Sequence, residues 1–270
     1  MRKQVHIALT VLLVAIAGVI LWQVLRQREP EPVYQAKPLK VWLRQWATTH
    51  LDGDGGDLGR QTETAIRQIG TNAIPIYLGM VTTKESALKL KMLTLVPSRW
   101  AGRFPRSKVY EYRLLGAYGL IALGAKSKPA VPALMALLND ADPDVRATAA
   151  FTLQSLSPVA SDALPSLITC LQDPSYTVQY HAILGIGQIR QEPERVIPLL
   201  IAYLDKPLDP HWATLRNCAI CSLRQFGAQA KPAVPMLIRL LEDSHSNIRS
   251  DATNALKVID PDAAAKAGAR

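Results

Sequence analysis

A motif of about 33 residues recurs along this chain, and a fixed period of that size constrains a fold more than any other sequence feature. Five segments align at offsets of 33, 33, 37 and 33 residues: YRLLGAYGLIALG (112–124), VRATAAFTLQSLS (145–157), VQYHAILGIGQIR (178–190), LRNCAICSLRQFG (215–227) and IRSDATNALKVID (248–260). They share one polar column, which holds Arg113, Arg146, Gln179, Arg216 and Arg249. A proline follows nineteen residues after the first four: Pro132, Pro165, Pro198 and Pro235. Because the polar column and the proline keep a constant spacing in four successive segments, we predict stacked repeats.

Each repeat is predicted to contain two helices. In the first, apolar or small residues recur at i, i+4, i+8 and i+11, as in Val145, Ala149, Leu153 and Leu156, which is one helical face. The second begins near the proline, which a first helical turn tolerates because its N–H groups lack partners there. Neither helix can bury its apolar face alone. We therefore predict an all-α fold, a right-handed solenoid of about five helix pairs over residues 110–262, with a frayed tail at 263–270.

The paired helices resemble the HEAT repeat family, including the HEAT-like repeats of the phycobilisome-lyase type, over roughly residues 60–260. In that family an acid six residues before the column arginine helps to link successive turns as a ladder. Asp140 and Asp243 stand in that position before Arg146 and Arg249, but Asp173 precedes Gln179, and Pro210 stands where an acid would precede Arg216. The resemblance therefore implies a ladder that is incomplete around the fourth and fifth units.

The residues before the main repeats form two further segments. Residues 60–109 are predicted to hold a divergent first repeat at 63–81 and then a basic insertion. Residues 29–59 are predicted to be a juxtamembrane linker, a capping helix and a Gly/Asp loop. Their EPVYQAKPLKVWLRQWA (31–47) resembles the leader of bacterial membrane-anchored HEAT-repeat proteins. One helical face there would carry Leu39, Trp42, Leu43 and Trp46, favouring a cap over the first repeat, with a membrane-docking helix as the alternative.

The amino terminus is predicted to be a membrane anchor over residues 1–28. No fully charged residue occurs between Lys3 and Arg26, and a helix of that length reaches roughly 33 Å, enough for a bilayer core of about 30 Å. The anchor would include Ile7, Leu12, Ile16, Leu21 and Trp22. A cleaved signal peptide is the alternative. We expect a single-pass protein of the bacterial inner membrane with the repeats exported, although basic residues flank the segment on both sides.

A basic segment contributes to the net charge of +9, which comes from 31 Lys and Arg against 22 Asp and Glu. Between residues 84 and 108 it holds Lys84, Lys89, Lys91, Arg99, Arg103, Arg106 and Lys108, with Trp100 and Phe104 among them. A solvated loop is the favoured interpretation. Contact with anionic lipid or an acidic partner comes second, and nucleic acid is the least favoured.

The sequence offers no pattern around which to build catalysis. Cys218 and Cys221 form a C-x-x-C pair without the further ligands that zinc needs, and Cys170 is the one other cysteine. The loop LDGDGGDLG (51–59) lacks the alternating acids and distal glutamate of an EF-hand. Gly185-Ile186-Gly187 lies in a helical segment, where small residues serve close packing. We therefore predict a protein that is not an enzyme and has no cofactor or metal. A lyase-like enzyme is the alternative that the resemblance suggests.

The predicted function is a membrane-tethered scaffold that binds a protein or peptide partner on its solenoid surface. Such arrays offer an extended concave face, normally lined by the second helices. The positions we expect on that face, pointing away from the buried stripe, are Asn139, Gln172, Asp205, Arg239 and Glu242. Their mixture of charges is typical of a protein-binding surface, and no small-molecule substrate is predicted.

Overall fold

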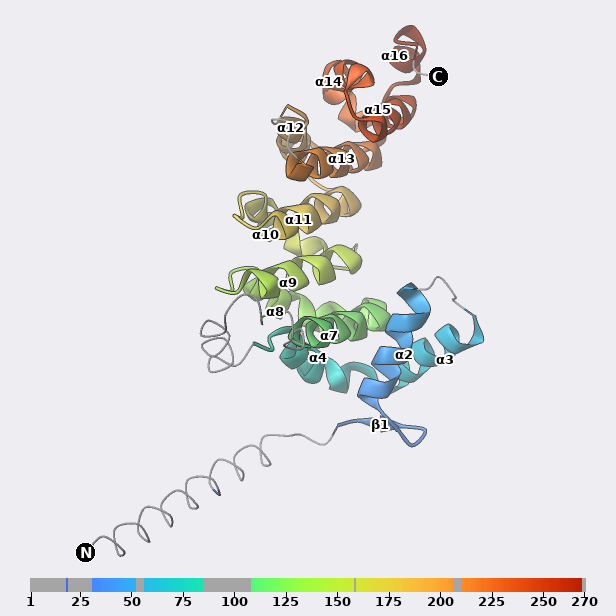
Figure 1. Ribbon diagram of the computed structural model, residues 1–270, viewed down its shortest axis with the longest axis vertical. Coiled ribbons are helices and arrows are strands. Elements are labelled where there is room, and N and C mark those ends of the chain that lie inside the picture. Colours follow the sequence, from blue (N-terminus) through green and yellow to red (C-terminus); the bar gives the residue numbers. More distant parts are fainter. Residues whose placement is uncertain are drawn as a thin grey trace, which may run out of the picture.

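A computed structural model describes residues 31–51, 56–84, 108–157, 159–205 and 210–268, together with Gly18. These residues form helices and one short hairpin, arranged as an array of helix pairs along the long axis of the molecule (Figure 1). The predicted membrane anchor, with Ile7, Leu12, Ile16, Leu21 and Trp22, lies outside the described residues and stays a prediction.

The five predicted units are helix pairs. Their first helices are α7 (Val109–Leu123), α9 (Pro143–Ser155), α11 (Tyr176–Ile189), α13 (Pro210–Gln225) and α15 (Ser246–Ile259). Their second helices are α8 (Val131–Leu137), α10 (Leu164–Cys170), α12 (Pro193–Leu204), α14 (Val234–Arg239) and α16 (Pro261–Lys266). Short 3-10 segments flank them: η2 (Gly124–Ala130), η3 (Ser161–Ala163), η4 (Gly227–Ala233) and η5 (Leu240–Glu242). The predicted all-α solenoid is confirmed at this level.

The units share one continuous core. Each first helix from α7 to α13 packs on the next first helix, and α8, α10, α12 and α14 each pack on the first helix of the following unit. The stripe predicted in α9 is buried, since Val145, Ala149 and Leu153 are all 0% exposed. The tail predicted from residue 263 instead begins inside α16, which packs on α15 and buries Ala264. The side chain of Asp260 caps this helix by accepting from the Ala263 N–H at 3.1 Å.

The prolines mark the second helices, with one difference. Pro132, Pro165 and Pro235 lie at the first turns of α8, α10 and α14. Pro198 instead lies inside α12, which begins earlier, at Pro193. The turn before α12 contains Arg190 and Glu192, whose φ angles of 54° and 49° are in the left-handed region. The units that begin with α7, α9 and α13 have a 3-10 segment at this place.

In the described residues before the five units there are a hairpin and three α-helices. Strands β1 (Val33–Tyr34) and β2 (Lys37–Pro38) pair antiparallel and lead into α2 (Leu39–Leu51). The chain continues through α3 (Asp57–Ile69), η1 (Gly70–Ala73) and α4 (Ile74–Val81). The predicted apolar face of α2 is buried, with Leu39, Trp42, Leu43 and Trp46 at most 6% exposed. Helix α2 packs on α3 and α7, which is the contact expected of a capping helix.

The ladder implied by the resemblance is present and links one unit to the next. Arg146 donates to the carboxylate of Asp173, and Arg216 donates to that of Asp243 at 2.9 Å. The two residues of each pair are 27 positions apart in the sequence. Each acid lies six residues before the column residue of its own unit and pairs with the column arginine of the preceding unit. Gln179 interrupts the series, because it is uncharged and Pro210 stands where its acid would be. Its side chain keeps the other contact of the column, since it donates to the backbone carbonyl of Asp173 at 2.7 Å as Arg146 does to that of Asp140. Pro210 does not prevent the pairing of Arg216, whose partner lies ahead of it in the chain.

One described segment, Val109–Leu137, is long and apolar enough to cross a membrane by length and composition. It comprises α7, η2 and α8, which together form the first of the five helix pairs. Leu120 and Leu134 in this segment are both 0% exposed within the core. Its apolar character therefore reflects packing between the repeats.

Candidate functional site

An open groove of about 300 Å³ lies along three successive first helices, α7, α9 and α11. It is lined by Tyr110, Leu114, Tyr118, Asp144, Ala147, Thr148, Phe151, Thr177 and His181. The repeat period helps to explain its shape, because Leu114 of α7 and Ala147 of α9 occupy equivalent positions 33 residues apart. Ala147 carries only a methyl group, so the surface of α9 is hollow where α7 carries the larger Leu114. The three helices lie one above another in Figure 1.

A row of rings supports this groove. Trp46 of α2 lies 5.2 Å from Tyr118 between ring centroids, and Tyr118 lies 6.1 Å from Phe151 with the planes at 84°. The row continues to His181, whose ring centroid is 5.3 Å from that of Phe151. These separations lie in the range where aromatic rings attract one another. Four helices therefore hold the aromatic walls in fixed positions.

The charge in the groove comes from one side chain. Asp144 is the one lining residue that is formally charged at neutral pH, and its side chain is 70% exposed. Burial lowers the pKa of His181 to about 4, so its imidazole is neutral at pH 7. The His181 Nδ1 lies 2.8 Å from the Gln154 Oε1, which orients the ring. The groove is thus apolar and aromatic with a single carboxylate.

The environment of Asp144 leaves this carboxylate accessible. Arg113 Nη1 lies 3.5 Å away, but the Arg113 guanidinium also donates to Asp142 at 2.5 Å and to the Thr83 carbonyl at 2.7 Å. Arg113 itself is 2% exposed. Its shortest contacts are therefore with Asp142 and the Thr83 carbonyl, and its contact with Asp144 is longer.

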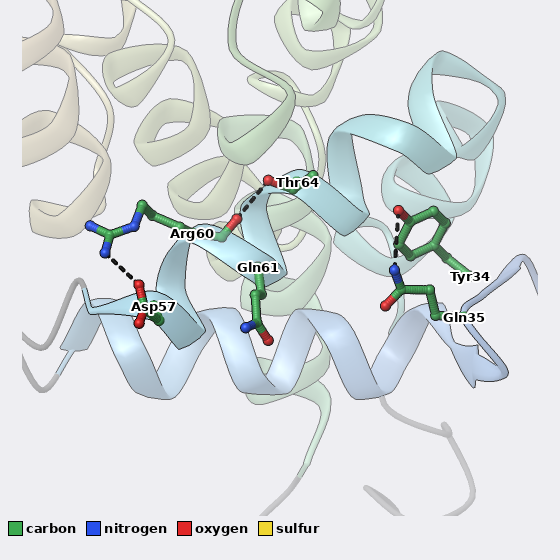
Figure 2. Close-up of a pocket in the computed structure, with 6 residues that line it drawn as sticks. All are labelled: Tyr34, Gln35, Asp57, Arg60, Gln61 and Thr64. Atoms are coloured by element: carbon green, nitrogen blue, oxygen red, sulfur yellow. Dashed lines mark hydrogen bonds and ion pairs between the residues drawn. The ribbon is translucent and has the colours of Figure 1, made fainter.

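A second cleft, of about 520 Å³, lies beside the hairpin (Figure 2). It is lined by Tyr34, Gln35, Asp57, Arg60, Gln61 and Thr64. In Figure 2 the pair of Arg60 and Asp57 lies at one end, Tyr34 and Gln35 lie at the other, and Gln61 lies between them. The Arg60 guanidinium bonds the Asp57 carboxylate at 2.6 Å, and both side chains are more than 70% exposed. This cleft is a solvated polar surface whose charges already satisfy one another.

The surface residues predicted for protein binding lie near the ends of second helices. Asn139, Gln172, Asp205, Arg239 and Glu242 are all exposed. Asp205 and Arg239 approach each other to 3.8 Å across two units. None of the five lines the groove between α7, α9 and α11. They form a separate surface, and their role in binding stays a prediction.

The basic segment is described only at its two ends. Lys84 pairs with Asp140 at 2.9 Å, and Lys108 is exposed next to the start of α7. Lys89, Lys91, Arg99, Arg103 and Arg106 lie outside the described residues. Contact of this segment with lipid, an acidic partner or nucleic acid therefore stays untested.

The three cysteines are free, and no group of three metal-ligating side chains occurs in the part of the chain that the structure describes. Burial raises the pKa of Cys170 to about 11 and that of Cys218 to about 12. Burial also raises the pKa of the half-buried Cys221. Thiols that stay protonated are poor nucleophiles and poor metal ligands, so these residues serve packing. In the loop predicted to lack calcium, Asp57 pairs with Arg60, and Asp52 and Asp54 lie outside the described residues.

The groove residues were not predicted from the sequence. A signal for them exists, because Tyr110, Leu114 and Tyr118 recur at i, i+4 and i+8 outside the core stripe. Tyr118 and Phe151 also occupy the same position in successive units. Exposed aromatic residues repeated at the period of a solenoid indicate a surface feature shared by neighbouring repeats.

Stacked helix pairs with a continuous core define the chain as an α-solenoid repeat protein. Residues 131–215 match the HEAT repeat family. This part of the chain is therefore similar to HEAT repeats, in agreement with the resemblance noted in the sequence. No curated protein shows significant similarity to this chain.

Among the matching solved structures is the complex of CpcE and CpcF of phycocyanin lyase from Nostoc sp. PCC7120. The match has 20% identity and a TM-score of 0.46 and covers 89% of this chain and 85% of that chain. It contradicts our prediction that the protein is not an enzyme, since that solved complex is a lyase, and we do not retain the prediction. A likeness at this level does not transfer an activity or a partner.

Proposed function

We propose that the protein is a HEAT-repeat scaffold that binds a protein partner in the groove between α7, α9 and α11. The observation that carries this proposal is the exposure of aromatic groups there: Tyr110 is 60% exposed, and Tyr118 and Phe151 are partly exposed in the same groove. Aromatic side chains that remain in water are costly unless they serve a contact, and they dominate binding energy at protein interfaces.

The size and openness of the groove favour a protein over a small molecule. Pockets for drug-sized ligands enclose most of the ligand surface and have volumes of roughly 300–1,000 Å³. This groove lies at the lower end of that range and is partly open to solvent, which suits one or two side chains of a longer segment. The rest of such a partner would extend over neighbouring repeats, as solenoid surfaces allow.

The test is a variant that fills the groove. In Ala147→Trp, an indole replaces the partly exposed methyl group that lines the groove. Ala136→Trp is the matched control, since Ala136 is an exposed helical alanine on α8 near Asn139. Proteins labelled by proximity in the native cell should be lost with Ala147→Trp and kept with Ala136→Trp. Loss only with Ala136→Trp would assign binding to the second helices, and no loss with either would refute partner binding at both surfaces.

We also propose that residues 1–28 tether this scaffold to a membrane, with the repeats exported. The support is the uncharged stretch between Lys3 and Arg26. The fraction of protein that sediments with membranes should fall sharply when residues 1–28 are deleted. A reporter active only after export, fused at Arg270, should be active in the full-length protein. Equal sedimentation of both forms would contradict the proposed tether. An inactive reporter would show that the repeats lie on the cytoplasmic side.

A lyase-type enzyme is the second candidate function. Its support is that one apolar groove contains a carboxylate, Asp144, and a neutral imidazole, His181, which are groups able to accept and deliver a proton. The absorption spectrum of phycocyanin incubated with the purified protein would change if the activity were present. The change should disappear in Asp144→Asn and persist in Asp262→Asn, which alters an exposed carboxylate on α16. An unchanged spectrum with the wild-type protein would remove phycocyanin as the substrate.

A further inference from the structure

The groove combines three features that bear on which chemical group it accepts. Its walls carry the rings of Tyr110, Tyr118 and Phe151, and the planes of Tyr118 and Phe151 are nearly perpendicular. Its one formal charge is the carboxylate of Asp144. Among the described residues that line it, none is a lysine or arginine. The face of an aromatic ring is the negative part of its quadrupole, so a ring that presents its face to the groove attracts the same sign of charge as the carboxylate does.

Asp144 has room for a second cation. Its described cationic neighbour, Arg113, lies at 3.5 Å and makes shorter contacts with Asp142 and the Thr83 carbonyl. The Asp144 side chain is 70% exposed. Thr148 also lines the groove, and its hydroxyl donates to the backbone carbonyl of Asp144 at 2.7 Å. This hydrogen bond does not use the Asp144 carboxylate.

We propose that the groove between α7, α9 and α11 binds an arginine side chain presented by an extended segment of a partner protein, with the guanidinium at Asp144 and its aliphatic stem against Phe151 and Tyr118. This inference rests on the proposed function and names the chemistry of its partner. The planar guanidinium stacks on aromatic faces and pairs with carboxylates in two-point geometry. The three methylene groups of arginine cover apolar walls while the charged end stays near water.

The direct test uses blocked amino acids as probes and the full-length protein in detergent, labelled with ¹³C in alanine methyl groups. The Ala147 methyl lines the groove and reports on binding, and the Ala136 methyl is the internal control. Nα-acetyl-arginine methylamide should shift the Ala147 resonance to saturation in the millimolar range. Nα-acetyl-citrulline methylamide, which has the same shape without the charge, should bind about fivefold more weakly. High salt should weaken only the arginine probe.

Variants separate the charge from the shape of the groove. Asp144→Asn should lower the affinity for the arginine probe to that for citrulline, and Asp262→Asn, which changes an exposed carboxylate on α16, should leave both affinities unchanged. Equal binding of both probes to the wild-type protein, or an unchanged arginine affinity in Asp144→Asn, would overturn the inference. Tighter binding of Nα-acetyl-leucine methylamide would show instead that the groove takes an apolar anchor.

The outcomes of this test and of the groove-filling test are distinguishable. If Ala147→Trp abolishes labelling of the partner but the arginine probe does not shift the Ala147 methyl, the binding function stands and the arginine inference fails. If the probe binds but Ala147→Trp leaves partner labelling intact, the groove accepts the cation but the proposed function fails.

Discussion

Arg146 of α9 donates two hydrogen bonds to the carboxylate of Asp173, at 2.8 and 2.9 Å, and so connects one repeat to the next. The same guanidinium donates to the backbone carbonyl of Asp140 at 2.9 Å. The two paired side chains are 13% and 10% exposed. A nearly buried, two-point ion pair of this kind leaves an unpaired charge when one partner is removed.

Arg146→Ala is therefore expected to destabilise the protein by about 2–3 kcal/mol. The control Arg60→Ala removes an ion pair with Asp57 that is 72% and 87% exposed, so its effect should stay within about 0.5 kcal/mol. Urea unfolding followed by circular dichroism measures both changes. Similar losses in the two variants would show that burial of the ladder does not set its contribution.

Gly119→Ala is expected to destabilise the contact between α4 and α7. A Cβ at Gly119 would lie 2.4 Å from the Tyr77 Cε1, and Tyr77 is 0% exposed, so its ring cannot move into solvent. We expect a loss of about 1–3 kcal/mol from overpacking. Gly79→Ala, on α4 with no atom within 4 Å of the new Cβ, should instead raise stability by up to about 1 kcal/mol. Thermal unfolding of both variants tests this, and a neutral Gly119→Ala would contradict the packing.

His181 is expected to make the protein less stable as the pH falls. Burial lowers its pKa to about 4 in the folded protein, against about 6.5 in an unfolded chain. Between these values the unfolded state binds the proton and the folded state does not, so stability is full above about pH 6.5 and decreases towards pH 4. Melting temperatures measured over this range should show the decrease, and His181→Leu should reduce its slope. If the melting temperature fell with pH at the same rate in both proteins, titratable groups other than His181 would cause the decrease.

The cysteines should differ in reactivity according to their burial. Cys170 and Cys218 are buried with raised pKa values, and Cys221 is partly exposed. A thiol reagent at pH 8 should therefore modify Cys221 first and the other two only on unfolding. Mass spectrometry of the native protein identifies the site, and Cys221→Ser should remove the early adduct. Rapid modification of Cys218 would contradict its burial.

The sequence by itself determined the helix pairs of the first four units and their order, but it did not predict α16, which pairs with α15 in the fifth. The stripe in α9 and the proline that opens α8 are local signals, because they depend on residues within one helix and the known geometry of its turns. The same reasoning predicted the buried face of α2, including Trp42. A repeated local pattern of this kind has one efficient solution, in which neighbouring units bury one another's apolar faces.

The tertiary structure decided which side chains meet across units. The sequence associates Arg146 with the acid at 140, but the folded chain pairs it with the carboxylate of Asp173 and uses only the backbone carbonyl of Asp140. The groove depends on a small side chain, Ala147, between the larger residues of two other helices. A hollow, or a ring that fits against a glycine as Tyr77 does, is a property of several helices at once. It depends on how far apart those helices pack and on how their side chains interlock, which a periodic pattern does not specify.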